Sequence, residues 1–296
     1  MSGMHRDRVD PVKQGRLRLA IQVITAVLLN GYAAGFAGGK IYAGDLKKVC
    51  VPVLNCYSCP GAVGSCPVGA LQTMLGSHGR VPFYVLGLLM LFGILLGRAV
   101  CGFLCPFGLV QDLLAKIPVK KRRVPGRIDR PARYLKYVVL ALLIMIPVLS
   151  RYGEPVFCKY LCPAGTLEAG IPLMIADPAL RALRGVLFHW KIMLLIIILV
   201  SAVFVPRCFC RYLCPLGAFY SFFQKFSFYQ MEIRKERCVE CHQCDDACPM
   251  DLDVTKEIRS AECIRCGRCR AVCPENIIEI SFSGKKISKV ETIKNR

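Results

Sequence analysis

Acidic residues are scarce in this chain of 296 residues, which holds 20 aspartates and glutamates against 40 lysines and arginines. No group of residues has the pattern of an acid–base or nucleophilic catalyst. This absence argues against an enzyme that works with its own side chains. Any chemistry would therefore be that of a bound cofactor.

Charge is also missing from long stretches of the chain. The sequence is 54% hydrophobic with a mean hydropathy of +0.45, which is too apolar for an ordinary soluble domain of this size. Four apolar runs, residues 17–38, 81–97, 134–150 and 185–206, are candidate membrane spans. The middle two have 17 residues, near the short limit for a hydrocarbon core of ~30 Å. Buried helices of a large soluble protein, or a cleaved signal peptide for the first run, are the alternatives.

The excess of positive charge lies on one side of these runs. Residues up to 18, residues 98–136 and the part from Arg207 onward together hold 31 of the 40 lysines and arginines. Cytoplasmic loops carry such an excess, so we expect both termini to be cytoplasmic. The charge would face anionic lipid of the bilayer, and nucleic-acid binding is not needed to explain it.

The motif Cys-Pro-x-Gly occurs four times, at Cys66, Cys105, Cys162 and Cys214. The expected topology puts the first and third copies outside and the second and fourth inside, so the membrane part resembles two parallel duplicated halves. Arg98 and Arg207 each lie seven residues before an inner Cys-Pro cysteine.

The duplication predicts clusters shared between the halves. A Cys-x-x-x-Cys pair offers two thiolates, half of what a [4Fe-4S] cube needs, and a related copy at the same face supplies the rest. The inner set would be Cys101, Cys105, Cys210 and Cys214. For the outer set we favour Cys59, Cys66, Cys158 and Cys162, with Cys56 the alternative to Cys59, and Cys50, Cys56 and Cys208 spare or alternative ligands. Outer disulfides, and inert or zinc-bound inner cysteines, are the other interpretations.

The C-terminal part carries the most specific pattern. The run C-x2-C-x2-C-x3-C-P occurs twice, as in bacterial two-cluster ferredoxins, where the fourth cysteine of each run binds the other cluster. The predicted ligands are Cys238, Cys241, Cys244 and Cys273 for one cluster, and Cys263, Cys266, Cys269 and Cys248 for the second. Zinc is the alternative. Residues 277–282 are expected to form a short closing strand.

Together these motifs resemble the membrane-bound ferredoxins of the NapH and MauN type, to which the membrane core of NosR is related. The resemblance implies an α-helical membrane protein with four transmembrane helices and a C-terminal α+β two-cluster ferredoxin domain. It also implies a bacterial cytoplasmic membrane and electron exchange with the quinone pool. The expected organisation is a basic tail at 1–16, a membrane domain at 17–230 and a ferredoxin domain at 231–296. The outer cysteines depart from typical NapH members and suggest that electrons reach a partner at the outer face.

Three functions follow from this pattern. The first is an electron relay between cytoplasmic ferredoxin clusters, membrane clusters and either quinone or an outer redox partner. The second is a quinol dehydrogenase subunit, in which His78 with Arg80, and His189 with Lys191, bind quinone or ligate haem; anchoring at the membrane interface is the simpler role for these four residues. The third is a redox regulator or maturation factor. We expect no extra domain of the kind such regulators carry, because 16 residues precede the first apolar run and 23 follow Cys273.

Overall fold

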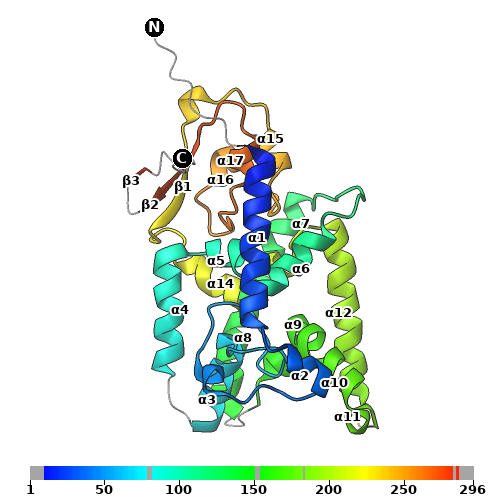
Figure 1. Cartoon of the computed structure of the whole chain (residues 1–296). Coiled ribbons are helices and arrows are strands. Elements are labelled where there is room, and N and C mark those ends of the chain that lie inside the picture. Colours follow the sequence, from blue (N-terminus) through cyan, green and yellow to red (C-terminus); the bar gives the residue numbers. More distant parts are fainter. Residues whose placement is uncertain (1–9, 79–81, 151–153, 183, 283–284, 287–296) are drawn as a thin grey trace, which may run out of the picture.

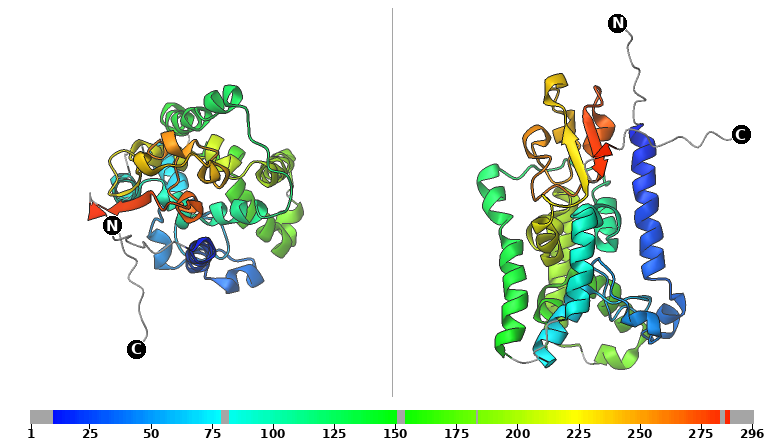
Figure 2. Two further views of the ribbon diagram at one scale, coloured as in Figure 1. Left: turned by 90° about the horizontal axis from the view of Figure 1, so that it is seen from above. Right: turned by 90° about the vertical axis from the view of Figure 1, so that its left-hand side faces the viewer.

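Four long helices run alongside one another (Figure 1). Residues 229–282 and 285–286, called the ferredoxin part below, lie at one end of them. The computed structural model describes residues 10–78, 82–150, 154–182, 184–282 and 285–286. The four long helices are α1 (Pro11–Leu29), α4 (Phe83–Leu96), α8 (Leu135–Ser150) and α12 (Val186–Phe204). Figure 2 shows the same layout from the side, with α1 and α8 on opposite flanks.

Two of the helical segments within the described ranges are long and apolar enough to cross a membrane, namely Gly126–Leu149 and Val186–Phe204. The apolar helix Phe83–Leu96 is shorter. The first expected span, residues 17–38, is not one helix: α1 starts six residues earlier and ends at Leu29. Asn30 caps it, and the short helix α2 (Ala33–Gly38) follows. The structure thus supports a largely helical protein with apolar helices and leaves four spans as a prediction.

Short helices at the two ends of the long ones carry the Cys-Pro motifs. Beneath the ferredoxin part lie α5 (Ala99–Phe103), α6 (Pro106–Leu114), α7 (Gly126–Ala132), α13 (Cys208–Tyr212) and α14 (Pro215–Phe222). At the opposite end lie η1 (Asp45–Lys48), α3 (Pro67–His78), η2 (Phe157–Leu161), α9 (Pro163–Gly165), η3 (Thr166–Gly170), α10 (Ile171–Ala176) and α11 (Pro178–Ala182). The first and third motifs therefore lie at the end far from the ferredoxin part, and the second and fourth lie directly beneath that part (Figure 1).

The ferredoxin part is a small sheet with short helices. β1 (Tyr229–Ile233) pairs antiparallel with β2 (Ile278–Phe282), which pairs with β3 (Lys285–Lys286). The remaining elements are η4 (Lys235–Arg237), α15 (Gln243–Asp246), α16 (Val254–Glu257) and α17 (Arg268–Val272). β2 confirms the expected closing strand, whereas β1 was not predicted.

The backbone of this part repeats with the cysteines. Positive φ angles occur at Glu240, His242 and Asp251, and again 25 residues later at Arg265, Gly267 and Asn276. The eight cysteines repeat with the same offset. A positive φ angle allows the backbone to turn sharply. Since the turns recur at the same offset as the cysteines, the two runs fold alike.

A segment from the far end folds back between the long helices. Val53, Leu54 and Asn55 are each at most 2% exposed. The Tyr220 hydroxyl of α14 donates to the Pro52 carbonyl at 2.7 Å. This segment, residues 50–66, carries no charged side chain, which makes its burial inexpensive. It brings Cys50 and Cys66 toward the middle of the molecule.

Buried charges tie the ferredoxin part to the helices. Glu262 accepts from Arg98 Nη1 at 3.0 Å and from Lys136 Nζ at 2.5 and 2.6 Å. Arg265 donates to the side chain of Ser227 and to the carbonyls of Gln224 and Tyr229. Removing one partner from such a buried network leaves an uncompensated charge, so these bonds fix how the two parts sit together.

Candidate metal centres

The ferredoxin cysteines surround two separate cavities. One is lined by four cysteines from both runs, Cys238, Cys241, Cys244 and Cys273. The other is lined by Cys248, Cys263, Cys266 and Cys269. Each cavity thus receives three thiols from one run and the fourth from the other, the crossed arrangement that the spacing predicts.

These thiols suit a cluster better than a single ion. Among the described residues, no group of three or more His, Cys, Asp or Glu side chains could hold one metal ion. A zinc ion needs its sulfur ligands at ≈ 2.3 Å from one point. Four thiols around a cavity, with apolar Ile258 and Ile264 completing the wall of the second one, fit a cubane cluster of iron and sulfide.

The inner cysteines come together from the two halves of the chain. The thiols of Cys105 and Cys214 each lie within electrostatic range of Cys101 and Cys210. All four are less than 9% exposed. Gln111 Nε2 donates to Cys210 Sγ at 3.2 Å, so one thiol already has a polar donor. The two pairs share one end of the molecule, as their duplication requires.

The Cys-Pro-x-Gly motif makes each second cysteine the cap of a helix. Cys105 is the N-cap of α6 and Pro106 is its first helical residue, where a missing N–H costs nothing. In two of the four motifs the glycine N–H donates to the sulfur of the capping cysteine: Gly165 to Cys162 and Gly217 to Cys214, each at 3.4 Å. The two inner cysteines of a pair therefore lie on two helices, one within α5 and one capping α6, and not on one continuous turn.

Arg98 and Arg207 cross between the halves. Arg207 Nη1 donates to the Cys101 carbonyl at 2.6 Å, and Arg98 Nη2 donates to the Cys210 carbonyl at 3.2 Å. Both side chains are fully buried. Arg207 also donates to Asp112 at 2.6 Å. Their equal spacing from the Cys-Pro cysteines marked the two arginines as equivalent positions, but their reciprocal bonds are visible only in three dimensions.

The outer cysteines line a larger cavity of about 660 Å³. Cys56, Cys66, Cys158 and Cys162 contribute to its wall. Cys59, which the sequence favoured, is not among the lining residues; its Sγ lies 3.6 Å from Asn30 Oδ1. The half-buried Glu168 accepts from the Cys56 N–H at 2.8 Å. The structure thus groups Cys56 with the other three outer cysteines, the alternative that the spacing left open.

Two further cysteines stand apart from these groups. Cys208 directs its Sγ to the Ile198 carbonyl at 3.6 Å. Cys50 is buried and its backbone pairs with Ser65 in an isolated bridge. Neither lines the outer cavity, and none of the nineteen cysteines forms a disulfide within the described residues.

Of the two predicted histidine and basic pairs, the structure describes both side chains only for His189 and Lys191. Arg80 and the side chain of His78 lie outside the described residues. His189 is exposed, with Nδ1 3.0 Å from the Gly185 carbonyl oxygen. Lys191 lines the outer cavity and donates to the Cys158 carbonyl at 3.1 Å. Lys191 thus holds an outer cysteine turn in the way that Arg207 holds an inner one.

Comparison with known protein families identifies iron–sulfur domains along most of this region. A 4Fe-4S binding domain matches residues 81–125, 135–171 and 186–231, and a 4Fe-4S dicluster domain matches residues 230–274. The first three ranges contain the second, third and fourth Cys-Pro motifs in turn. No solved structure matches the chain.

Three relatives illustrate the similarity. An uncharacterized protein of Methanocaldococcus jannaschii is 34% identical over 75% of this chain and 89% of its own length. The methylamine utilization ferredoxin-type protein MauN of Paracoccus denitrificans is 28% identical over 52% of this chain and 48% of its own. The regulatory protein NosR of Stutzerimonas stutzeri is 26% identical over 52% of this chain and 20% of its own. By these similarities and its crossed ferredoxin cysteines, the chain belongs to the NapH/MauN-type polyferredoxins.

Proposed function

We propose that this chain relays electrons from its ferredoxin clusters through the inner cysteine set to the quinone pool or to a redox partner at the opposite end. The observation that carries the proposal is the arrangement of the thiols in successive groups along the molecule. An iron–sulfur cluster, when bound, supplies one-electron transfer. The protein contributes thiol ligands, N–H donors to sulfur and buried cations that hold the sites in line.

Contact between the second ferredoxin site and the inner site supports this route. A Cβ built on Gly102, which lies between Cys101 and Cys105, would come within 2.6 Å of the Ile264 carbonyl oxygen. Ile264 lies between Cys263 and Cys266, so the two ligand loops touch backbone to backbone. Gln224 Nε2 donates to the Cys263 carbonyl at 2.6 Å and reinforces the contact. Tunnelling fades steeply with distance, which makes such contact useful for transfer.

The buried 50–66 segment supports a continuation to the outer set. Tyr220 packs beside the inner cysteines and bonds the segment at Pro52. The segment itself carries Cys56 and Cys66 at the outer cavity. The segment therefore provides a path of packed protein between the inner and the outer cysteines. We assign Cys56, Cys66, Cys158 and Cys162 as the outer ligands.

Outward-facing apolar side chains support a four-span membrane location. Each long helix exposes large hydrophobic residues, which include Ile24 and Leu28 on α1, Leu91 on α4, Leu142 on α8 and Ile197 on α12. Such a continuous exposed surface suits lipid better than water. Because the basic segments lie at the ferredoxin end, we expect that end to face the cytoplasm.

A quinol dehydrogenase role has one specific feature in its favour. The outer cavity extends beyond its thiols to Leu54, Ala70, Met74 and Leu173, and its volume of about 660 Å³ is in the range of small-molecule sites. We propose that a quinone headgroup could enter here beside Lys191. A Leu173→Trp variant that fills this wall should abolish quinol oxidation and leave the iron content unchanged. Unaltered quinol oxidation in that variant would contradict this second role.

Iron and labile-sulfide counting after anaerobic purification tests the relay. About sixteen irons per chain would match four cubes, and about twelve would match the ferredoxin and inner sites alone. About eight would leave the membrane cysteines without metal and would contradict the relay beyond the ferredoxin part. Stepwise chemical reduction of the purified chain, followed by electron paramagnetic resonance, then tests whether electrons pass from the ferredoxin clusters to the membrane sites.

A further inference from the structure

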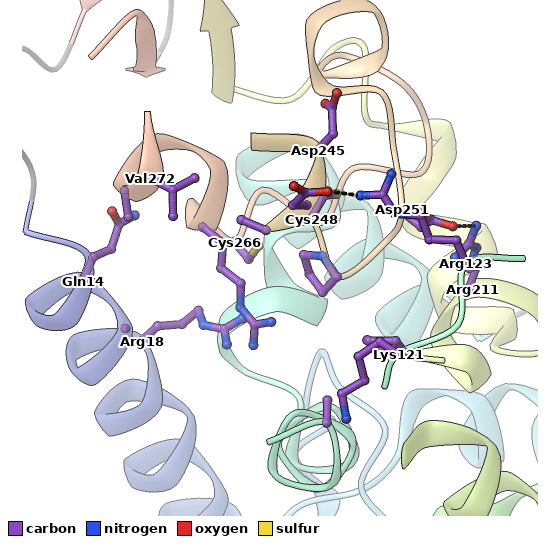
Figure 3. Close-up of a pocket in the computed structure, with 18 of the residues that line it drawn as sticks. Gln14, Arg18, Lys121, Arg123, Arg211, Asp245, Cys248, Asp251, Cys266 and Val272 are labelled. Atoms are coloured by element: carbon purple, nitrogen blue, oxygen red, sulfur yellow. Dashed lines mark hydrogen bonds and ion pairs between the residues drawn. The ribbon is translucent and has the colours of Figure 1, made fainter. Parts of the chain in front are cut away.

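A basic cavity of about 470 Å³ lies between α1, the segment after α6 and the ferredoxin loops (Figure 3). It borders the second ferredoxin cavity, because Cys248 and Cys266 line both. Six of its lining residues are basic and three are acidic. They are Arg18, Lys121, Arg122, Arg123, Arg211, Arg268, Asp245, Asp246 and Asp251.

The three acids are already engaged with other groups. Asp251 pairs with Arg123 at 3.6 Å and with Arg211 at 3.3 Å, and Asp246 pairs with Arg123. Asp245 accepts from the Val254 N–H at 2.7 Å. The cavity wall therefore keeps a net positive charge from its other basic residues.

Arg18 shows where that charge is only partly compensated. Its side chain is 8% exposed, and Nη2 lies 3.4 Å from Asp112 Oδ2. Asp112 is shared with Arg207 and Arg268, so three guanidinium groups surround one carboxylate. Arg18 Nη1 is buried and has no hydrogen-bond partner among the described residues. A buried donor left unsatisfied is costly, so such an atom at a cavity indicates a missing acceptor.

We propose that this cavity binds the phosphate group of an anion at the junction of α1 and the ferredoxin part. Figure 3 shows Arg18 reaching from α1 toward Cys266, with Lys121 below and Arg123 and Arg211 across the cavity. Guanidinium and ammonium groups that converge in this way recognise phosphate oxygens through charge-assisted bonds. Two sources share this chemistry: an anionic phospholipid headgroup and free inorganic phosphate.

The surface beside the cavity favours the phospholipid. Leu17 next to Arg18 is 61% exposed, and Ile24 further along α1 is 57% exposed. Acyl chains can lie along these residues while the headgroup enters the cavity, an inference that rests on the proposed membrane location. The bound phosphate would sit beside Cys248 and Cys266, so it would also add negative charge next to a predicted cluster.

Lipid retention tests the site independently of electron transfer. The full chain is purified in neutral detergent, mixed with equal molar amounts of phosphatidylglycerol and phosphatidylcholine, and analysed by native mass spectrometry. Inorganic phosphate is titrated separately by calorimetry. Arg18→Gln and Arg122→Gln should each weaken binding about tenfold, the loss expected for one charge-assisted bond. Lys120→Gln is the matched control, because Lys120 is exposed and does not line the cavity.

The outcomes separate the two sources and can overturn the site. Selective retention of phosphatidylglycerol supports the lipid, and phosphate binding without lipid retention supports the free anion. Arg122 is exposed, so its variant keeps the test valid even where Arg18→Gln fails to fold. The proposal is wrong if neither probe binds, or if Lys120→Gln weakens binding as much as Arg122→Gln. Iron content, measured in the same samples, reports separately on the proposed relay.

Discussion

The inner and outer cysteine sets share the Cys-Pro-x-Gly motif but differ in regularity. In the inner set both pairs keep the C-x3-C-P spacing, and Arg98 and Arg207 bond across the halves to Cys210 and Cys101. In the outer set the first half has alanine at position 62, so its second thiol comes from the loop at Cys56. The inner site is consequently tight and symmetric, whereas the outer site is a roomy cavity.

The electrostatic surroundings differ as well. Two buried arginines and Lys136 lie around the inner set, each with a buried acid as partner. The outer set has Lys191 bonded at Cys158 and the half-buried carboxyl of Glu168 bonded at Cys56. Positive charge beside a cluster raises its reduction potential. We therefore expect the inner site to accept electrons more readily than the outer site.

Replacement of an inner ligand should have the largest effect. Cys105→Ser should remove about four irons per chain, because three thiolates from two crossing pairs do not complete a cube. Cys208→Ser is the matched control, since its thiol bonds the Ile198 carbonyl and does not line the outer cavity. Iron analysis of the purified proteins measures both, and equal loss in the two variants would contradict the inner assignment.

The outer site is tested by two cysteines that lie three residues apart. Cys56→Ser should also remove about four irons, whereas Cys59→Ser should leave the iron content unchanged. The reason is that Cys56 lines the cavity and Cys59 does not. The reverse result would restore the ligand set that the sequence favoured. Loss in neither variant would mean that the outer cysteines bind no cluster.

The next largest difference is expected in the free energy of unfolding lost when a basic residue at the inner or the outer site is replaced. Arg207→Gln leaves Asp112 with weaker partners in a buried network, which should destabilise the fold by about 3–5 kcal/mol. Lys191→Gln removes the corresponding bond at Cys158 and should cost only about 1 kcal/mol. Chemical denaturation in detergent, followed by circular dichroism, gives both values. Similar losses would show that the outer site is as tightly built as the inner one.

The smallest effect is expected at the link between the two sites. Tyr220→Phe removes the bond to the Pro52 carbonyl and should cost about 1 kcal/mol. Hydrogen exchange should quicken in residues 50–66 and stay unchanged elsewhere. Tyr137→Phe, which removes a contact of 2.7 Å with the Ser221 hydroxyl, is the control. Unchanged exchange in the segment would mean that Tyr220 does not hold it.

Local patterns predicted much of this molecule. The crossed ferredoxin sets, the strand β2 and the grouping of the inner cysteines all follow from spacing and repeats, because copies of a sequence fold alike. Helix bounds were less predictable: Asp10 accepts the N–H of Val12 and starts α1 before its apolar run begins. The roles of Cys56 and Glu262 were not predictable, because they depend on contacts between segments more than 100 residues apart, which no local pattern records.

The contact of Gly102 with Ile264 has a consequence for biosynthesis. The inner cysteines come from residues 101–105 and 210–214, but the Ile264 backbone that packs on Gly102 is synthesised later. A nascent chain that ends before Ile264 has all four inner thiols and lacks this contact. The contact that covers the inner cysteines can therefore form only after the ferredoxin part has been synthesised.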